Sequence, residues 1–163
     1  MHDMKSAVAA ATAAATFAAV FVALYIGHLL GDHIVQTSAQ AEVKGTRGWP
    51  GRLACVSHVA TLTATKVGIL AAVVLTLHLP VTIPGLVLGS AVDAVSHYWA
   101  DRRFMLLGLV RAIRRGRYLD HCTVVRKPDK DADATGPGTA AFEIDQTWHV
   151  LWLGVAALVI ATI

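Results

Sequence analysis

Residues 6–36 read SAVAAATAAATFAAVFVALYIGHLLGDHIVQ, and this stretch decides the fold class of the chain. No residue before Asp32 in it carries a formal charge. The run exceeds the roughly 20 residues that an α-helix needs to cross a hydrocarbon layer. Lys5 followed by an apolar run resembles the start of a secretory signal peptide, but this run is too long for a typical signal core. We therefore expect an uncleaved first membrane helix over about 6–36.

The composition agrees with a membrane protein. Apolar residues make up 55% of the 163 residues and charged residues 15%, whereas soluble domains carry about 45–50% and about 25%. The length allows one domain. Basic residues gather around 44–52 and 102–130 without the interleaved aromatic residues of a nucleic-acid surface, so we expect no nucleic-acid partner.

Three more apolar segments follow, separated by polar ones, and none of the segments alternates like a strand. The sequence therefore predicts an all-α fold, a polytopic membrane four-helix bundle formed as a single transmembrane domain over residues 1–163. The expected parts are membrane helices at about 6–36, 53–79, 81–103 and 142–163, a polar connection at 37–52, an interfacial amphipathic helix at about 104–119 and a mobile loop at 120–141.

The basic residues also predict an orientation. The first and third connections hold nearly all of them, while the short turn near Pro80 holds none. The positive-inside rule then places those two connections in the cytoplasm and both termini outside, in the inner (cytoplasmic) membrane of a bacterium.

Each predicted membrane helix carries a potential metal ligand in its apolar sequence. Three helices carry them as pairs spaced i,i+4, which share one helix face and can converge on one ion. The candidates are His28 and Asp32, His58, Asp93 and His97, and Asp145 and His149.

These side chains are also expected at one depth. Because the helices alternate in direction, counting residues from the cytoplasmic ends brings all of them into one layer. A carboxylate facing lipid would cost about 2.5–3.5 kcal/mol on insertion scales, so the Asp residues should face the interior. His with carboxylate suits a divalent metal, zinc first, with iron or manganese as alternatives, as one or two ions. The alternative is an Asp–His network that shares protons and only holds the helices together.

Neighbouring polar residues are assigned supporting roles. Gln36 and Gln146 are candidates to hydrogen-bond the metal-bound imidazoles. Asp101 is expected to pair with Arg102 or another Arg at the interface. Lys66, in the middle of its helix, is expected to snorkel or to pair with an Asp.

At these residues the chain resembles an uncharacterised family of bacterial membrane proteins, a domain of unknown function. The shared pattern is H-x3-D-x3-Q (His28 to Gln36), a single His (His58), D-x3-H (Asp93 to His97) and D-Q-x2-H (Asp145 to His149). The resemblance spans roughly residues 24–153. More distantly, the chain is similar to inner-membrane proteins labelled metal-dependent hydrolases, an analogy that rests on the buried His and Asp residues.

Three functions follow as hypotheses. In a metal-dependent hydrolase of a lipid or other amphiphile, a carboxylate, Asp32 or Asp145, would act as general base. A metal or proton carrier would use the same residues as an ion path. A non-catalytic membrane scaffold would use them for helix packing alone. Membrane lipids are the expected partners, and the oligomeric state is left open.

Overall fold

The computed structural model describes residues 2–125, 131–132 and 134–163. Every regular element in these residues is a helix, so the predicted all-α class is confirmed. The elements are α1 (His2–Leu30), the π-helical turn η1 (Gly31–Val35), α2 (Ser38–Val43), α3 (Trp49–Leu77), α4 (Ile83–Asp101), α5 (Phe104–Ala112), α6 (Gly116–His121) and α7 (Ala140–Thr162).

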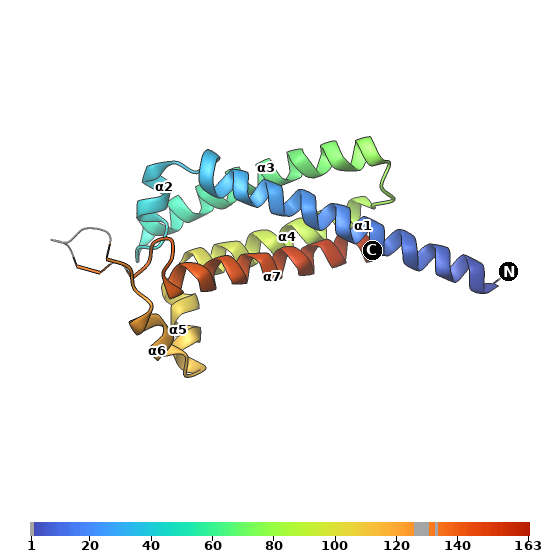
Figure 1. The fold of residues 1–163 in the computed structure, drawn as a ribbon. Coiled ribbons are helices and arrows are strands. Elements are labelled where there is room, and N and C mark those ends of the chain that lie inside the picture. Colours follow the sequence, from blue (N-terminus) through green and yellow to red (C-terminus); the bar gives the residue numbers. More distant parts are fainter. Residues whose placement is uncertain (1, 126–130, 133) are drawn as a thin grey trace.

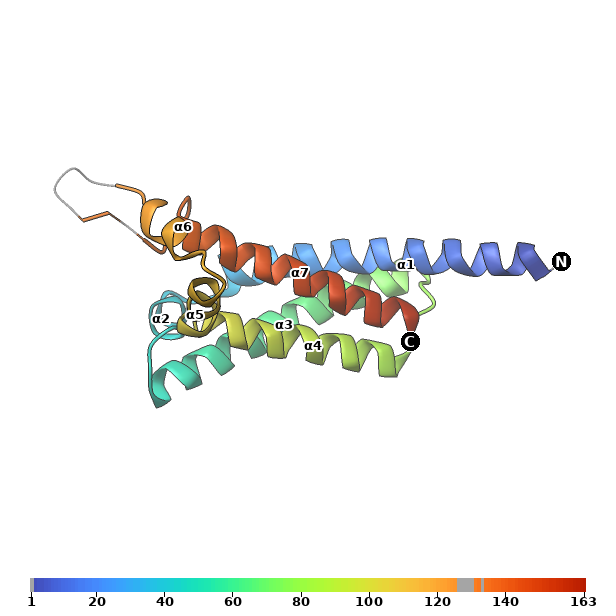
Figure 2. The same cartoon turned by 90° about the horizontal axis from the view of Figure 1, so that it is seen from below.

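The four long helices α1, α3, α4 and α7 run alongside one another (Figure 1). α1 packs against α3 and α7, and α4 packs against α7 and α3, which closes a ring of contacts. The short helices α2, α5 and α6 gather at one end, and both chain termini lie towards the other end (Figure 2).

The described residues form seven α-helices, not the four spans and one interfacial helix that the sequence predicted. α2 lies in the segment expected to be a polar connection, and a capping box starts it: Thr37 Oγ1 accepts from Gln40 N, and Gln40 Oε1 accepts from Thr37 N. The expected helix at 104–119 is two helices, because the chain turns at Arg114, whose φ is 62°.

The segment expected to be a mobile loop, 120–141, overlaps helices at both ends. Its first residues complete α6 and its last residues begin α7. Residues 126–130 and 133 lie outside the described residues, so the expectation of mobility there stays a prediction.

In the part of the chain that the structure describes, three helices are long and apolar enough to cross a membrane. They are α1 continued by η1 (Asp3–Val35), α3 and α7. α4 has 19 residues, but Asp93, Ser96 and His97 interrupt its apolar sequence, and it does not belong to this set.

Glycines spaced four apart allow the helices to approach closely. A Cβ on Gly31 would overlap the Leu62 side chain, and one on Gly27 would lie 2.8 Å from Lys66 Cα. On α4, a Cβ on Gly89 would lie 2.8 Å from the carbonyl oxygen of Ala156 on α7. Such small-xxx-small contacts are typical of packed membrane helices. They bring the polar faces of α1 and α4 against α3 and α7.

Candidate metal centre

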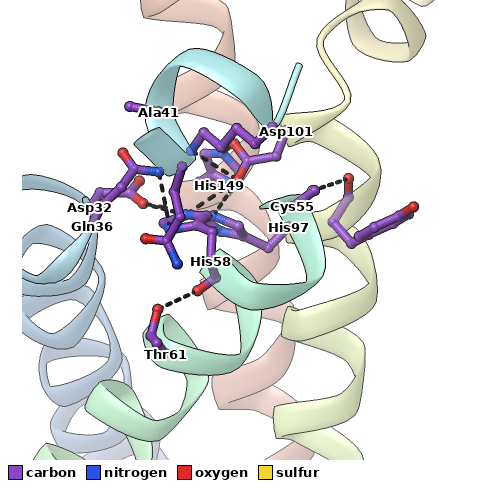
Figure 3. Close-up of polar contacts among 12 residues, drawn as sticks. Asp32, Gln36, Ala41, Cys55, His58, Thr61, His97, Asp101 and His149 are labelled. Atoms are coloured by element: carbon purple, nitrogen blue, oxygen red, sulfur yellow. Dashed lines mark hydrogen bonds and ion pairs between the residues drawn. The ribbon is translucent and has the colours of Figure 1, made fainter. Parts of the chain in front are cut away.

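Imidazoles and carboxylates from the four long helices and η1 converge near the end of the molecule that carries α2 and α5 (Figure 3). We call this set the His–Asp cluster. Its members are His28, Asp32, His58, His97, Asp101, Asp145 and His149.

Three atoms at its centre form a nearly equilateral triangle. His58 Nε2 lies 3.2 Å from His97 Nε2, and Asp101 Oδ2 lies 3.3 Å and 3.2 Å from these two nitrogens. Two ligands of one tetrahedral metal ion, each bonded at 2.0–2.1 Å, are about 3.3–3.4 Å apart. The triangle therefore has the edge lengths of three ligands on one ion. All three side chains are buried.

Asp32 and His149 flank the triangle. Asp32 Oδ1 is 2.9 Å from His58 Nε2, and His149 Nε2 is 3.8 Å from Asp101 Oδ1. Besides the triangle, two further sets of three ligand atoms among the described residues, each within 4.8 Å of one another, could hold an ion. One is Asp32, His58 and His97, and the other is His97, Asp101 and His149.

The remaining members of the His–Asp cluster lie at its edge. His28 Nε2 is 3.6 Å from Asp32 Oδ2, and Asp145 Oδ2 is 3.5 Å from His149 Nε2. The ring centroids of His28 and His149 are 5.2 Å apart, so the two i,i+4 pairs at the ends of the chain's first and last long helices face each other. Neither His28 nor Asp145 belongs to the two ligand sets.

Asp93, predicted as a ligand, is not brought to the cluster. Its Oδ2 accepts a hydrogen bond of 2.7 Å from Lys66 Nζ, and this ion pair is buried between α3 and α4. Lys66 was expected either to snorkel or to pair with an Asp, and the structure shows the pair with an Asp. Asp101 takes the predicted place of Asp93, one turn from His97 on the other side.

The expected pairing of Asp101 with Arg102 or another Arg was wrong for the described residues, where its partners are Lys44 and imidazoles. Arg102 donates instead to the carbonyl oxygens of Lys44 and Thr46, at 2.7 Å and 2.6 Å. This fixes the turn after α2 and holds Lys44 Nζ 2.9 Å from Asp101 Oδ2. Lys44 was not predicted at the site, because it lies in the segment 37–52 that was expected to be a polar connection.

Several atoms of the cluster lack a hydrogen-bond partner within the described residues. They are both ring nitrogens of His28, His97 Nδ1 and His149 Nε2. Asp32 Oδ1 and Asp101 Oδ2 instead have partners at 2.9 Å, His58 Nε2 and Lys44 Nζ. Most native proteins leave few buried polar groups in this state, and an unplaced ion is one of the usual reasons. Donors of this chemistry, imidazole and carboxylate, suit zinc, iron or manganese.

Both predicted supporting glutamines lie beside the cluster. Gln36 Nε2 is 3.0 Å from His58 Nδ1, the ring nitrogen that points away from the triangle. Asp32 lies within the π-helical turn η1 and Gln36 follows it directly, and both reach the same imidazole. Gln146 Nε2 donates to Asp145 Oδ2 at 3.4 Å.

A pocket of about 160 Å³ opens onto the cluster. Asp32, Asp101 and Asp145 line it together with both glutamines. The first residues of α5 and α7 supply apolar side chains to the same pocket. The pocket is therefore open to Asp32 and Asp145, whose side chains are 9% and 26% exposed, while Asp101 and the imidazoles of His58, His97 and His149 are at most 3% exposed.

Cys55, near His58, is not part of the cluster. Its Sγ donates to the carbonyl oxygen of Tyr98 at 3.7 Å, and the side chain is fully buried (Figure 3). This is the contact of a packing residue between α3 and α4.

Fold and site together define an all-α protein with helices apolar enough to cross a membrane and a buried His and Asp group able to hold a metal ion. The chain belongs to the family described as "Protein of unknown function (DUF3307)", whose sequence profile matches residues 20–163. This confirms the predicted membership of an uncharacterised family. No curated protein and no solved structure matches the chain.

Proposed function

We propose that this protein is a multi-pass membrane protein that holds a divalent metal ion in the His–Asp cluster and uses it to hydrolyse an amphiphilic substrate. The observation that carries the proposal is the triangle of His58 Nε2, His97 Nε2 and Asp101 Oδ2, with edges of 3.2–3.3 Å. Catalytic zinc sites combine three protein ligands with an open position, whereas structural sites are closed by four. The pocket beside Asp101 supplies that open side.

The charge of the cluster supports a divalent ion. It contains three carboxylates. When the imidazoles are neutral, the ammonium group of Lys44 offsets one of the three negative charges of the carboxylates. Two negative charges remain, which one divalent cation would neutralise. A bound metal of this kind lowers the pKa of its water to about 7 and polarises a carbonyl or phosphoryl oxygen.

In this proposal the residues of the site have different roles. His58, His97 and Asp101 hold the ion, and Gln36 orients the His58 ring through Nδ1. Asp145, at the pocket, accepts the proton of the attacking water and returns it to the leaving oxygen as the ester bond breaks. Asp32, 2.9 Å from His58 Nε2, is a fourth ligand or a second base.

Membrane embedding is part of the proposal. Large apolar side chains such as Ile26, Leu75 and Val95 are at least half exposed on the outer faces of α1, α3 and α4. Lipid would cover these side chains, and α4 would cross as the fourth span because its polar residues face inwards. The proposal places the site on the cytoplasmic side of a bacterial inner membrane, with both termini outside, and the basic residues near the site support this orientation.

A carrier is less well supported. From the cluster, buried polar groups continue one step along α3 and α4, to the Lys66 and Asp93 pair. Beyond it, an apolar core that includes Val20, Leu70 and Ile160 occupies the half of the molecule away from the pocket. A site accessible from one side suits hydrolysis better than transport.

Elemental analysis of the protein purified in detergent without chelator tests the metal. We expect about one ion per chain, lost in Asp101→Asn and in His97→Gln. Asp120→Asn and His121→Gln are the matched controls, because both residues are exposed and lie outside the cluster, and they should keep the ion. Ester and phosphodiester substrates in mixed micelles then test hydrolysis, which Asp145→Asn should lower at unchanged metal content. A wild-type protein without stoichiometric metal would overturn the proposal.

A further inference from the structure

The pocket at the cluster carries cations as well as carboxylates. Lys44 and Arg103 both line it, next to Asp101. Lys44 is 7% exposed, and a buried ammonium group is costly unless it has a partner. Its partner is Asp101, at 2.9 Å.

When the proposed metal ion is counted, the charges at this pocket favour an anionic ligand. With a divalent ion bound, the carboxylates of the cluster are balanced by the ion and Lys44 together. Arg103 then adds one positive charge at the pocket. A monoanion placed beside the ion would be neutralised, and a cationic substrate would be repelled.

The backbone around Arg103 is built to present this side chain. Arg103 has φ 47° and ψ −56°, a conformation that residues with a Cβ rarely adopt and that concentrates at functional sites. The facing residue is Gly45, where a Cβ would lie 2.8 Å from Arg103 Cδ. The Arg103 guanidinium also donates to the carbonyl oxygen of Ala41 at 3.3 Å. The absence of a side chain at Gly45 thus leaves room for the Arg103 side chain.

Apolar side chains complete the pocket. Leu106 and Leu107 from α5 and Phe142 from α7 line it beside the two cations. A ligand that fits must therefore join an anionic group to an apolar chain. Arginine and lysine together with a metal ion are the usual clamp for a phosphoryl group.

We propose that Lys44 and Arg103 form a binding site for the phosphate group of a phospholipid-type amphiphile, beside the metal ion. Lys44 and Arg103 contact the phosphate oxygens, and Leu106, Leu107 and Phe142 contact the first part of the acyl chain. This inference rests on the proposed function and names its substrate class.

The test uses the full chain in a phosphate-free detergent, loaded with Co²⁺ so that the visible spectrum reports ligands near the ion. Inorganic phosphate and dihexanoyl phosphatidic acid are titrated separately, with calorimetry as the second readout. We expect both to bind, the lipid at least tenfold more tightly. Lys44→Met and Arg103→Gln should each weaken both by about tenfold or more, because each removes a charged hydrogen bond. Cobalt content should stay unchanged.

Matched variants keep the result interpretable. Arg115→Gln removes an exposed arginine that does not line the pocket and should bind like the wild type. Lys44→Arg should restore much of the binding if Lys44→Met folds poorly. Leu107→Asn should weaken lipid binding and leave inorganic phosphate unaffected.

The failures are distinguishable. Wild-type protein that binds no cobalt would overturn the proposed function, and this inference with it. Cobalt-loaded Lys44→Met and Arg103→Gln that bind phosphate as the wild type does would overturn the phosphate site alone. Equal affinity for inorganic phosphate and the lipid would overturn the amphiphile as its ligand.

Discussion

The buried Lys66 and Asp93 pair offers a sharp test of how charge is arranged in the helices. Nζ and Oδ2 are 2.7 Å apart, and the residues are 2% and 4% exposed. Removing one partner of such a pair leaves an uncompensated buried charge and costs about 3–5 kcal/mol. Replacing both by apolar residues of similar volume is often close to neutral. Lys66→Met and Asp93→Leu should therefore each destabilise the protein strongly, and the double variant much less.

The assay is reversible unfolding in mixed micelles with increasing SDS, followed by circular dichroism. The double-mutant cycle should give a coupling free energy of roughly 3 kcal/mol or more between the two positions. Metal content should be the same in all four proteins, because neither residue contacts the ion in our account. Additive single effects would refute the buried pair, and loss of metal in Asp93→Leu would return Asp93 to the ligand set.

Three further predictions follow from the packing and the site. Gly89→Val should lower the free energy of unfolding by about 1–3 kcal/mol through overpacking, since a Cβ there would lie 2.5 Å from Ile160 Cγ1. Gly108→Val is the control, because a Cβ at Gly108 would meet nothing within 4 Å. Equal losses of stability in the two variants would contradict the close contact at Gly89. Gln36→Leu should weaken metal binding by about 10–100-fold, measured by competition with a chelator, because His58 Nδ1 loses its partner; an unchanged affinity would remove Gln36 from the site. Metal at 100 times its dissociation constant should stabilise the wild-type fold by about 2.7 kcal/mol and Asp101→Asn by much less, and equal stabilisation of the two would place the ion elsewhere.

The helical class and the convergence of the i,i+4 pairs could be predicted because both depend on helix periodicity. His28 with Asp32 and Asp145 with His149 have fixed relative directions on their own helices. The boundaries within the polar segments were less predictable. α2 has a sequence signal in Thr37 and Gln40, the two residues of its capping box, but the signal is short and the helix has only six residues.

The choice between Asp93 and Asp101 could not be made by spacing. Both stand four residues from His97, so periodicity treats them alike. What separates them is their partners, since Lys66 on α3 pairs with Asp93, and Lys44, directly after α2, pairs with Asp101. Partners across helices depend on how the helices dock, which the contacts at Gly27, Gly31 and Gly89 determine.

The most direct measurement is a crystal or cryo-EM structure of the protein purified with its metal, with the ion identified by anomalous scattering or X-ray absorption. We expect one ion bonded to His58 Nε2, His97 Nε2 and Asp101 Oδ2, at about 2.0–2.2 Å for zinc, with an open position facing the pocket of Lys44 and Arg103. An ion bound away from these atoms, or side chains that keep their positions with no ion after loading, would contradict it.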